Sequence, residues 1–86
     1  MTEYNGHKSY NYWNVSLWLF NDERLYDIVK QAFAPMKTRP KRNLTEATNW
    51  IRRRLEADLR TKDPHTPDGV PFLKAYIREA IRDYEE

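Results

Sequence analysis

Over most of this chain, apolar residues recur every three to four positions, which is the spacing of one face of an α-helix. The clearest such stretch follows Asn21, and its apolar face comprises Leu25, Ile28, Val29 and Ala32. Asp22 and Glu23 fall in its first turn, where carboxylates interact favourably with the positive end of the helix dipole. The pattern predicts a helix that is capped by Asn21 and ended by Pro35.

A second helical stretch covers residues 44–61, and its apolar face comprises Leu44, Ala47, Ile51, Leu55 and Leu59. Asn43 precedes this stretch and Glu46 follows three residues later, an arrangement that resembles a capping box. Trp50 widens the apolar face, so its ring is expected in the core. The sequence therefore predicts a helix that starts directly after Asn43.

The C-terminal stretch predicts a further helix, which begins near Val70 or Pro71 and ends near Tyr84. Its apolar side comprises Leu73, Ile77, Ala80, Ile81 and Tyr84. Proline is tolerated in the first turn of a helix, so Pro71 is compatible with this start. Asp68 or Thr66 is expected to cap the helix.

A dense aromatic and aliphatic run covers residues 12–20, and its pattern fits two structures. Alternation along the run fits a β-strand. As a helix, the run would have Asn11 as its N-cap, and one face would carry Trp13, Leu17 and Phe20. We favour the helix because the chain offers no second convincing strand, and an isolated strand leaves its backbone groups unpaired.

These elements predict an all-α fold, a small bundle of three main helices plus a short aromatic N-terminal helix. The alternative is an α+β fold in which residues 12–20 form a strand. A chain of 86 residues is expected to form a single domain, residues 1–86. Residues 1–10 are expected to be irregular, and residues 34–43 are expected to form a basic loop that contains proline.

The composition narrows the setting in which this protein works. The chain has no cysteine, which excludes disulfides, thiolate metal sites and a cysteine nucleophile. Its first residues are polar and lack the apolar core of a signal peptide, and no apolar run approaches the roughly 20 residues that span a bilayer. We expect a soluble cytoplasmic protein that makes no contact with a membrane.

The sequence offers no set of residues for catalysis or for binding a cofactor. His7 and His65 are the only histidines, and no further metal ligands accompany them at suitable spacing. Glycine occurs only at Gly6 and Gly69, so a glycine-rich phosphate loop is absent. Because an enzyme needs a positioned nucleophile or acid–base pair, we predict a protein that is not an enzyme and that has no cofactor, metal or catalytic residues.

The net charge of +2 is unevenly distributed along the chain. Residues 30–62 hold ten basic and three acidic side chains, which gives this segment a net charge of +7. Such a segment binds phosphates, meets an acidic protein surface, or is simply a solvated helix face. The candidate binding residues are Lys37, Arg39, Lys41, Arg42, Arg52, Arg53, Arg54 and Arg60.

The placement of these basic groups is expected to separate the alternatives. Basic groups along one stripe would favour nucleic acid, whereas interleaving with Glu46, Glu56 and Asp58 would favour a protein partner or mere solubility. Trp18 is a further candidate, because in the helical interpretation it falls on the far side from Trp13, which we expect in the core. An exposed Trp18 would be an anchor for a partner, since tryptophan is enriched in binding hot spots.

The stretch YNYWNVSLWLFNDERLY (residues 10–26) and the shorter stretch TPDGV (residues 66–70) together cover about a quarter of the chain. Both resemble motifs of a family of small uncharacterised proteins that are encoded mostly by phages, prophages and other mobile elements. The resemblance implies a viral or mobile-element setting, in which small proteins often act by binding a host macromolecule. It supplies no catalytic residues.

We therefore expect a non-enzymatic phage or mobile-element accessory protein that binds a host protein or nucleoprotein complex. The favoured target is a nucleic-acid-handling defence complex, so the chain would be an anti-CRISPR-like inhibitor in the cytoplasm of an infected or lysogenic host cell. The alternative is a small basic nucleic-acid-binding accessory protein. A homodimer also stays open, because a core of 86 residues is marginal alone.

Overall fold

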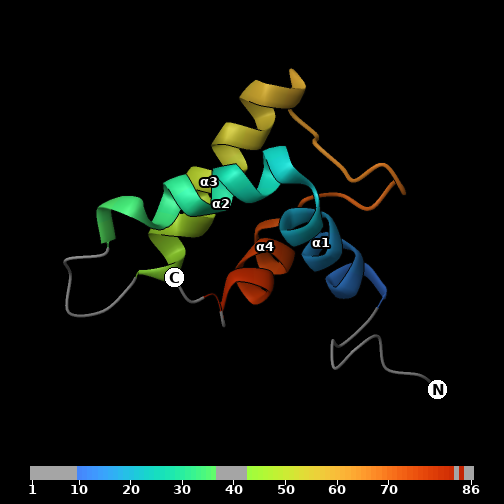
Figure 1. The fold of residues 1–86 in the computed structure, drawn as a ribbon. Coiled ribbons are helices and arrows are strands. Elements are labelled where there is room, and N and C mark those ends of the chain that lie inside the picture. The colour runs from blue at the N-terminus through green and yellow to red at the C-terminus, as the bar shows by residue number, and fades with distance from the viewer. Residues whose placement is uncertain (1–9, 37–42, 83, 85–86) are drawn as a thin grey trace.

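Four α-helices and one short 3-10 helix make up the regular structure of the described residues in the computed structural model, which are 10–36, 43–82 and 84 (Figure 1). In chain order the elements are α1 (Tyr10–Asn21), α2 (Glu23–Phe33), η1 (Ala34–Met36), α3 (Leu44–Leu59) and α4 (Lys74–Ile81). Helix α1 packs against α2 and α4, and α3 packs against α2 and α4. The predicted all-α fold is confirmed.

The alternative α+β fold is wrong, because residues 12–20 lie within α1. Over the described ranges the structure has no β-strand, only an isolated bridge between His65 and Pro71. A helix pairs its backbone groups within the segment itself, whereas a strand over residues 12–20 would have found no partner in this chain.

The buried face of α1 differs from the predicted one. Its buried residues are Asn14, Val15 and Leu19, whereas the expected set, Trp13, Leu17 and Phe20, is only partly buried. The reason is tertiary: α2 and α4 pack against the helix, and the segment before α4 bonds the side of α1 that carries Asn14. A helix that carries apolar residues on nearly every face does not reveal in its sequence which face the neighbouring helices will cover.

The junction of α1 and α2 corrects the predicted helix cap. Asn21 is the last residue of α1, and its side-chain amide donates to the Leu17 carbonyl at 2.9 Å. Asp22 is the N-cap of α2, with Oδ1 accepting from the backbone N–H groups of Arg24 (3.0 Å) and Leu25 (3.2 Å). Aspartate and asparagine cap equally well, so the sequence pattern placed the helix correctly and missed the cap by one residue.

Helix α3 begins as predicted and ends two residues earlier than predicted. Asn43 Oδ1 accepts from the Glu46 backbone N–H at 2.9 Å, which satisfies one N–H of the first turn. The helix ends at Leu59 because Arg60 adopts a left-handed conformation, with φ 55° and ψ 45°. Left-handed residues are a common way to end a helix, although glycine is the usual choice there.

Helix α4 is shorter than predicted, and neither proposed cap serves it. It begins at Lys74 rather than near Val70 or Pro71, and Leu73 occupies the N-cap position without a side-chain hydrogen bond. Thr66 and Asp68 do not cap it because their side chains bond residues of α1 instead.

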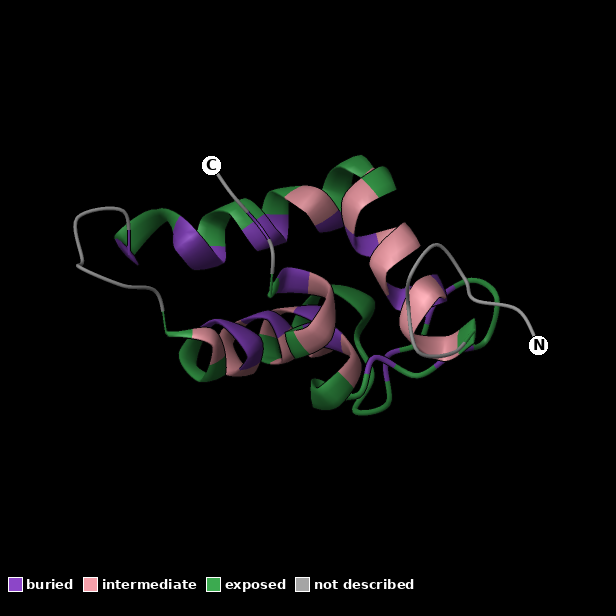
Figure 2. Cartoon of the chain, turned by 90° about the horizontal axis from the view of Figure 1, so that it is seen from below, coloured by how far each residue is buried: buried purple, intermediate pink, exposed green. Residues whose placement is uncertain are grey.

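Side chains from all four helices form one buried cluster. In α2 the buried and exposed positions lie on opposite sides of the helix, as an amphipathic helix requires (Figure 2). The largest fully buried side chains of the cluster include Phe72, Leu19, Ile51, Leu55 and Ile77.

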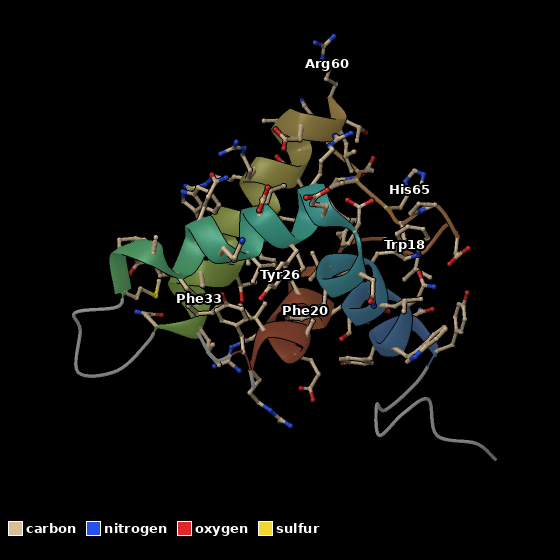
Figure 3. All side chains as sticks on the ribbon, in the orientation of Figure 1. Trp18, Phe20, Tyr26, Phe33, Arg60 and His65 are labelled. Carbon is tan, nitrogen blue, oxygen red and sulfur yellow. The ribbon has the colours of Figure 1, made fainter. Side chains whose placement is uncertain are left out.

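An aromatic group closes the end of the molecule at which α4 stops. Tyr84 follows α4 and is only 5% exposed. Its ring stacks on Phe33 with centroids 4.8 Å apart and lies 6.2 Å from Phe20 and 6.3 Å from Tyr26 (Figure 3). Stacked and edge-on aromatic pairs add stability beyond the area they bury, so this group fixes Tyr84 to α1 and α2.

Two predicted irregular segments are described only in part. Tyr10, predicted to be irregular, is the first residue of α1, and residues 1–9 lie outside the described residues. In the predicted loop 34–43, the first three residues form η1 and bury Met36, and residues 37–42 lie outside the described residues.

Candidate binding surfaces

Two buried polar side chains, Asn14 and Thr66, join α1 to the segment before α4. Thr66 Oγ1 donates to Asn14 Oδ1 at 2.6 Å, and Asn14 Nδ2 donates to Asp68 Oδ2 at 2.7 Å. Asn14 is fully buried and Thr66 is 1% exposed. Because buried polar groups are costly unless they are paired, these bonds specify how the segment lies on α1.

The segment itself is a tight reversal of the backbone. The Gly69 N–H bonds the Thr66 carbonyl at 2.8 Å, and the Thr66 N–H bonds the Val70 carbonyl at 2.7 Å. Gly69 has a φ of +92°, a conformation that L side chains rarely adopt. Thr66 Oγ1 also accepts from the backbone N–H groups of Asp68 and Val70, each at 3.2 Å. The order threonine, proline, aspartate, glycine suits such a turn.

The side chain of Asp68 links this turn to Trp18. Trp18 Nε1 donates to Asp68 Oδ2 at 3.0 Å, and Asn14 donates to the same oxygen. The hydrogen bond from Asn14, and next that from Trp18, lower the pKa of Asp68 below its ordinary value of 3.8, against a small opposing contribution from burial. Both bonds favour the carboxylate form, which holds the indole in place.

Next to Trp18 lies a groove of about 350 Å³, called here the Trp18 groove. It lies between the ends of α1 and α3, the first turn of α2 and the turn before α4, and its lining includes Trp18, Arg24, Leu25, Leu59, His65 and Phe72 (Figure 3). Trp18 was a candidate anchor on the condition that it is exposed. It is partly buried and is one of the residues that line the groove.

Of the three consecutive arginines of α3, two are bonded to neighbouring side chains. Arg52 pairs with Glu56 and also donates to the Lys62 carbonyl at 3.2 Å. Arg54 pairs with Asp58 at 3.3 Å and donates to Gln31 of α2 at 3.2 Å. These two arginines are paired with groups of the protein itself, so less of their charge is available to bind a partner.

Arg53 and Arg60 present their charge to solvent. Both are exposed, and among the described residues neither side chain has a hydrogen-bond or ion-pair partner. Arg60 projects from the end of α3 (Figure 3). Two adjoining hollows of about 270 and 390 Å³ share Arg53 and Ala57. We call this surface the α3 outer face; its residues are Trp50, Arg53, Arg54, Glu56, Ala57, Arg60, Thr61 and Lys62.

The structure thus brings together part of the predicted basic set. Arg53 and Arg60 line one hollow, and Arg54 joins Arg53 at the other. Arg52 lines neither hollow, and the remaining four candidates, Lys37, Arg39, Lys41 and Arg42, lie outside the described residues.

The sequence did not predict the hydrogen-bonded set of Asn14, Thr66 and Asp68. Two signals were present: a polar residue inside an apolar run, and a turn sequence with a threonine and an aspartate. The bonds themselves join residues 52 and 54 positions apart, a distance over which a local pattern carries no information.

The described residues also limit what else the surface can hold. No group of three histidine, aspartate or glutamate side chains among them is placed to bind a metal ion. None of the described helices has the length and apolar character needed to cross a membrane.

These features define a small all-α protein with two hollowed surfaces, one basic and one lined by both apolar and polar side chains. The chain belongs to a family of unknown function, DUF7249, whose family model matches residues 1–85. A search of curated proteins and a search of solved structures give no match. The predicted membership of an uncharacterised family is confirmed, and the two stretches that suggested it meet at Asn14, Thr66 and Asp68.

Proposed function

We propose that this chain is a non-enzymatic binding protein that uses the α3 outer face to bind an acidic surface of a partner protein. The proposed setting is that of a phage or other mobile element. The proposed partner is a host complex that handles nucleic acid in defence, so the chain acts as an anti-CRISPR-like inhibitor in the host cytoplasm. The resemblance of residues 10–26 and 66–70 to phage-encoded proteins supports this setting.

The observation that carries the proposal is the pair of unpaired arginines on a hollowed surface. Arg53 and Arg60 line the same hollow, and Lys62 adds a third basic group beside them. Glu56 is the only acidic residue among the residues that line the two hollows. A surface of this charge complements an acidic one, which raises the rate of association and fixes the orientation of the partners.

The ion pairs within α3 favour a protein partner over nucleic acid. Glu56 and Asp58 alternate with the arginines and bind Arg52 and Arg54. Phosphates laid along this helix would approach these two carboxylates closely, and like charges at such distances repel. A protein partner can place its own basic or neutral groups opposite the carboxylates.

The experiment is affinity capture of the tagged protein from bacterial lysate, with and without nuclease, compared for two charge-reversal variants. The test variant is Arg53→Glu with Arg60→Glu. The control is Lys74→Glu with Arg78→Glu, which reverses two exposed charges on α4. We expect a complex that survives nuclease, loses about tenfold or more in affinity in the test variant and persists in the control. Equal loss in both variants, or no complex in any relevant host, contradicts the proposal.

Nucleic acid is the second candidate, and the net charge of +7 on residues 30–62 favours it. In that case the captured material disappears with nuclease. Affinity for DNA then falls steeply as salt increases, and the salt slope decreases in the Arg53→Glu and Arg60→Glu variant.

A further inference from the structure

The Trp18 groove combines large apolar side chains with polar ones, and its volume suits one large side chain. Trp18, Leu25 and Phe72 contribute to its walls, and Leu59 stands at its edge with 38% of its surface exposed. At about 350 Å³ the groove falls within the range of ligand pockets, which are typically mostly apolar with a few polar groups that fix orientation. An occupant therefore gains by covering Leu59 and the indole ring.

The walls of the groove are fixed before any occupant arrives. The Trp18 indole is held by its 3.0 Å bond to Asp68, and Asp68 is held in turn by Asn14. Phe72 is 1% exposed, and its backbone N–H bonds the Pro64 carbonyl at 2.9 Å. A preformed pocket reduces the ordering cost of binding, which raises the affinity available to a short peptide.

One exposed charge at the groove, that of Arg24, favours an acidic occupant. Asp22 lines the groove, but its Oδ1 is engaged by two backbone N–H groups at the start of α2. Arg24 also lines the groove and is exposed, and its guanidinium has no hydrogen-bond or ion-pair partner among the described residues. A guanidinium pairs best with a carboxylate, which it can bind with two parallel hydrogen bonds.

His65 adds a polar group of defined orientation. Its Nδ1 lies 3.0 Å from the Asp63 carbonyl oxygen. A carbonyl can only accept, so Nδ1 carries the hydrogen of this bond. The bond holds the ring in place at the wall of the groove.

We propose that the Trp18 groove binds a peptide segment of a protein partner in which a large apolar side chain stands next to an acidic residue. The apolar side chain fills the groove against Trp18 and Leu59, and the carboxylate pairs with Arg24. The proposal rests on the proposed function only in that the occupant belongs to a protein partner. It uses a different surface from the α3 outer face.

The test is titration of the 15N-labelled full chain with four short peptides, followed by NMR. The probes are acetyl-Gly-Phe-Glu-Gly-amide and its counterparts with Gln or Lys in place of Glu, or Ala in place of Phe. The chain has three tryptophans, so the indole N–H of Trp18 reports on the groove, that of Trp50 reports on the α3 outer face, and that of Trp13 serves as an internal reference. We expect a saturable shift of the Trp18 signal, with a Kd of about 1 mM or tighter for the Phe-Glu peptide.

The order of peptide affinities tests the two contacts in the proposal, the carboxylate with Arg24 and the apolar side chain in the groove. The Gln peptide is expected to bind about two- to fivefold more weakly than the Glu peptide, the Lys peptide more weakly again, and the Ala peptide least. In the Arg24→Gln variant, the Glu and Gln peptides should bind equally. The matched control is Arg78→Gln, which removes an exposed arginine of α4 and should preserve the preference for Glu.

A second pair of variants tests the apolar contact. Leu59→Glu should abolish the shift of the Trp18 signal, whereas Leu73→Glu should not, because Leu73 is equally exposed at 45% but does not line the groove. Both positions are on the surface, so both variants are expected to fold, and unchanged Trp50 signals would verify this.

Three results would overturn the proposal: no saturable shift of Trp18, shifts confined to Trp13 or Trp50, or equal affinity for the Glu and Lys peptides. A shift confined to Trp50 would report binding at the α3 outer face, which includes Trp50. The other results do not bear on that face, whose test is the capture experiment with Arg53 and Arg60. Conversely, failure of that experiment leaves the peptide titration intact. The two proposals therefore stand or fall separately.

Discussion

Asn14 shows how a single polar residue can determine the arrangement of two distant segments. It is completely buried in α1, and its amide accepts from Thr66 and donates to Asp68. Thr66 Oγ1 in turn accepts from two backbone N–H groups of its own turn. Each buried polar group in this set has a partner, so removing one side chain leaves the others without a hydrogen bond.

The first prediction concerns the hydroxyl at the centre of this set. Thr66→Val keeps the shape of the side chain and removes the donor to Asn14 and the acceptor for the Asp68 and Val70 N–H groups. We expect the free energy of unfolding to decrease by about 1–3 kcal/mol, because buried groups lose their partners. Urea denaturation monitored by circular dichroism measures the change.

Thr48→Val is the matched control. Thr48 is 3% exposed, and its Oγ1 is buried with no hydrogen-bond partner among the described residues. Removing an unpaired hydroxyl costs nothing in lost bonds, so this variant is expected to be at least as stable as the parent chain. Equal destabilisation by the two substitutions would show that steric fit, and not hydrogen bonding, decides the stability of the turn.

At the scale of elements, two chain reversals frame the Trp18 groove, and both depend on a left-handed residue. Gly69 has a φ of +92° in the turn before α4, and Arg60 has a φ of 55° where α3 ends. Glycine adopts such angles without steric cost, whereas arginine does not. The two sites should therefore respond in opposite ways to substitution.

The second prediction is that substitutions at Gly69 and Arg60 change the free energy of unfolding in opposite directions. A Cβ at Gly69 would meet no heavy atom within 4 Å, so the cost of Gly69→Ala is conformational only, and we expect it to be about 1–2 kcal/mol. Arg60→Gly relieves the strained cap and is expected to stabilise the protein by about 0.5–1 kcal/mol. Midpoints of urea denaturation compare the two; a loss of stability in Arg60→Gly would show that its side chain contributes contacts beyond the cap.

At the scale of the whole molecule, particular residues show which features could be predicted from the sequence and which could not. Periodicity located three of the four helices, and the lack of a partner strand favoured the helix over residues 12–20. Asn43 was recognisable as a cap because capping is local. Thr66 and Asp68 were mistaken for caps because nothing near them reveals a partner on α1. Trp18 was a candidate anchor only if exposed, and only tertiary packing shows that it borders a groove.

The same distinction explains the candidate surfaces. The three arginines at 52–54 are evident in the sequence. Which of them are paired depends on the helical spacing to Glu56 and Asp58 and on the contact with α2. The Trp18 groove draws on residues from four separate segments, so no single stretch predicts it. Chemistry that depends on one segment was predictable, and chemistry that depends on several was not.

The last prediction concerns cooperativity. Side chains from all four helices share one buried cluster, and Tyr84 closes it against Phe33 and Phe20. A single-domain chain with one core is expected to unfold in one transition. Tyr84→Ala removes a buried ring and should lower the free energy of unfolding by about 2–5 kcal/mol. The loss should be global, although the substitution lies at the end of the chain.

Two probes test this. Tryptophan fluorescence reports on α1 and α3, which carry the three tryptophans, and far-ultraviolet circular dichroism reports on all helices. In Tyr84→Ala both midpoints should fall together, whereas Leu73→Ala, at a position 45% exposed, should move neither by much. If the ellipticity midpoint falls while the fluorescence midpoint stays, the C-terminal segment unfolds separately. In that case the chain is more than one cooperative unit, because α1 and α3 would keep their packing without the aromatic group that Tyr84 completes.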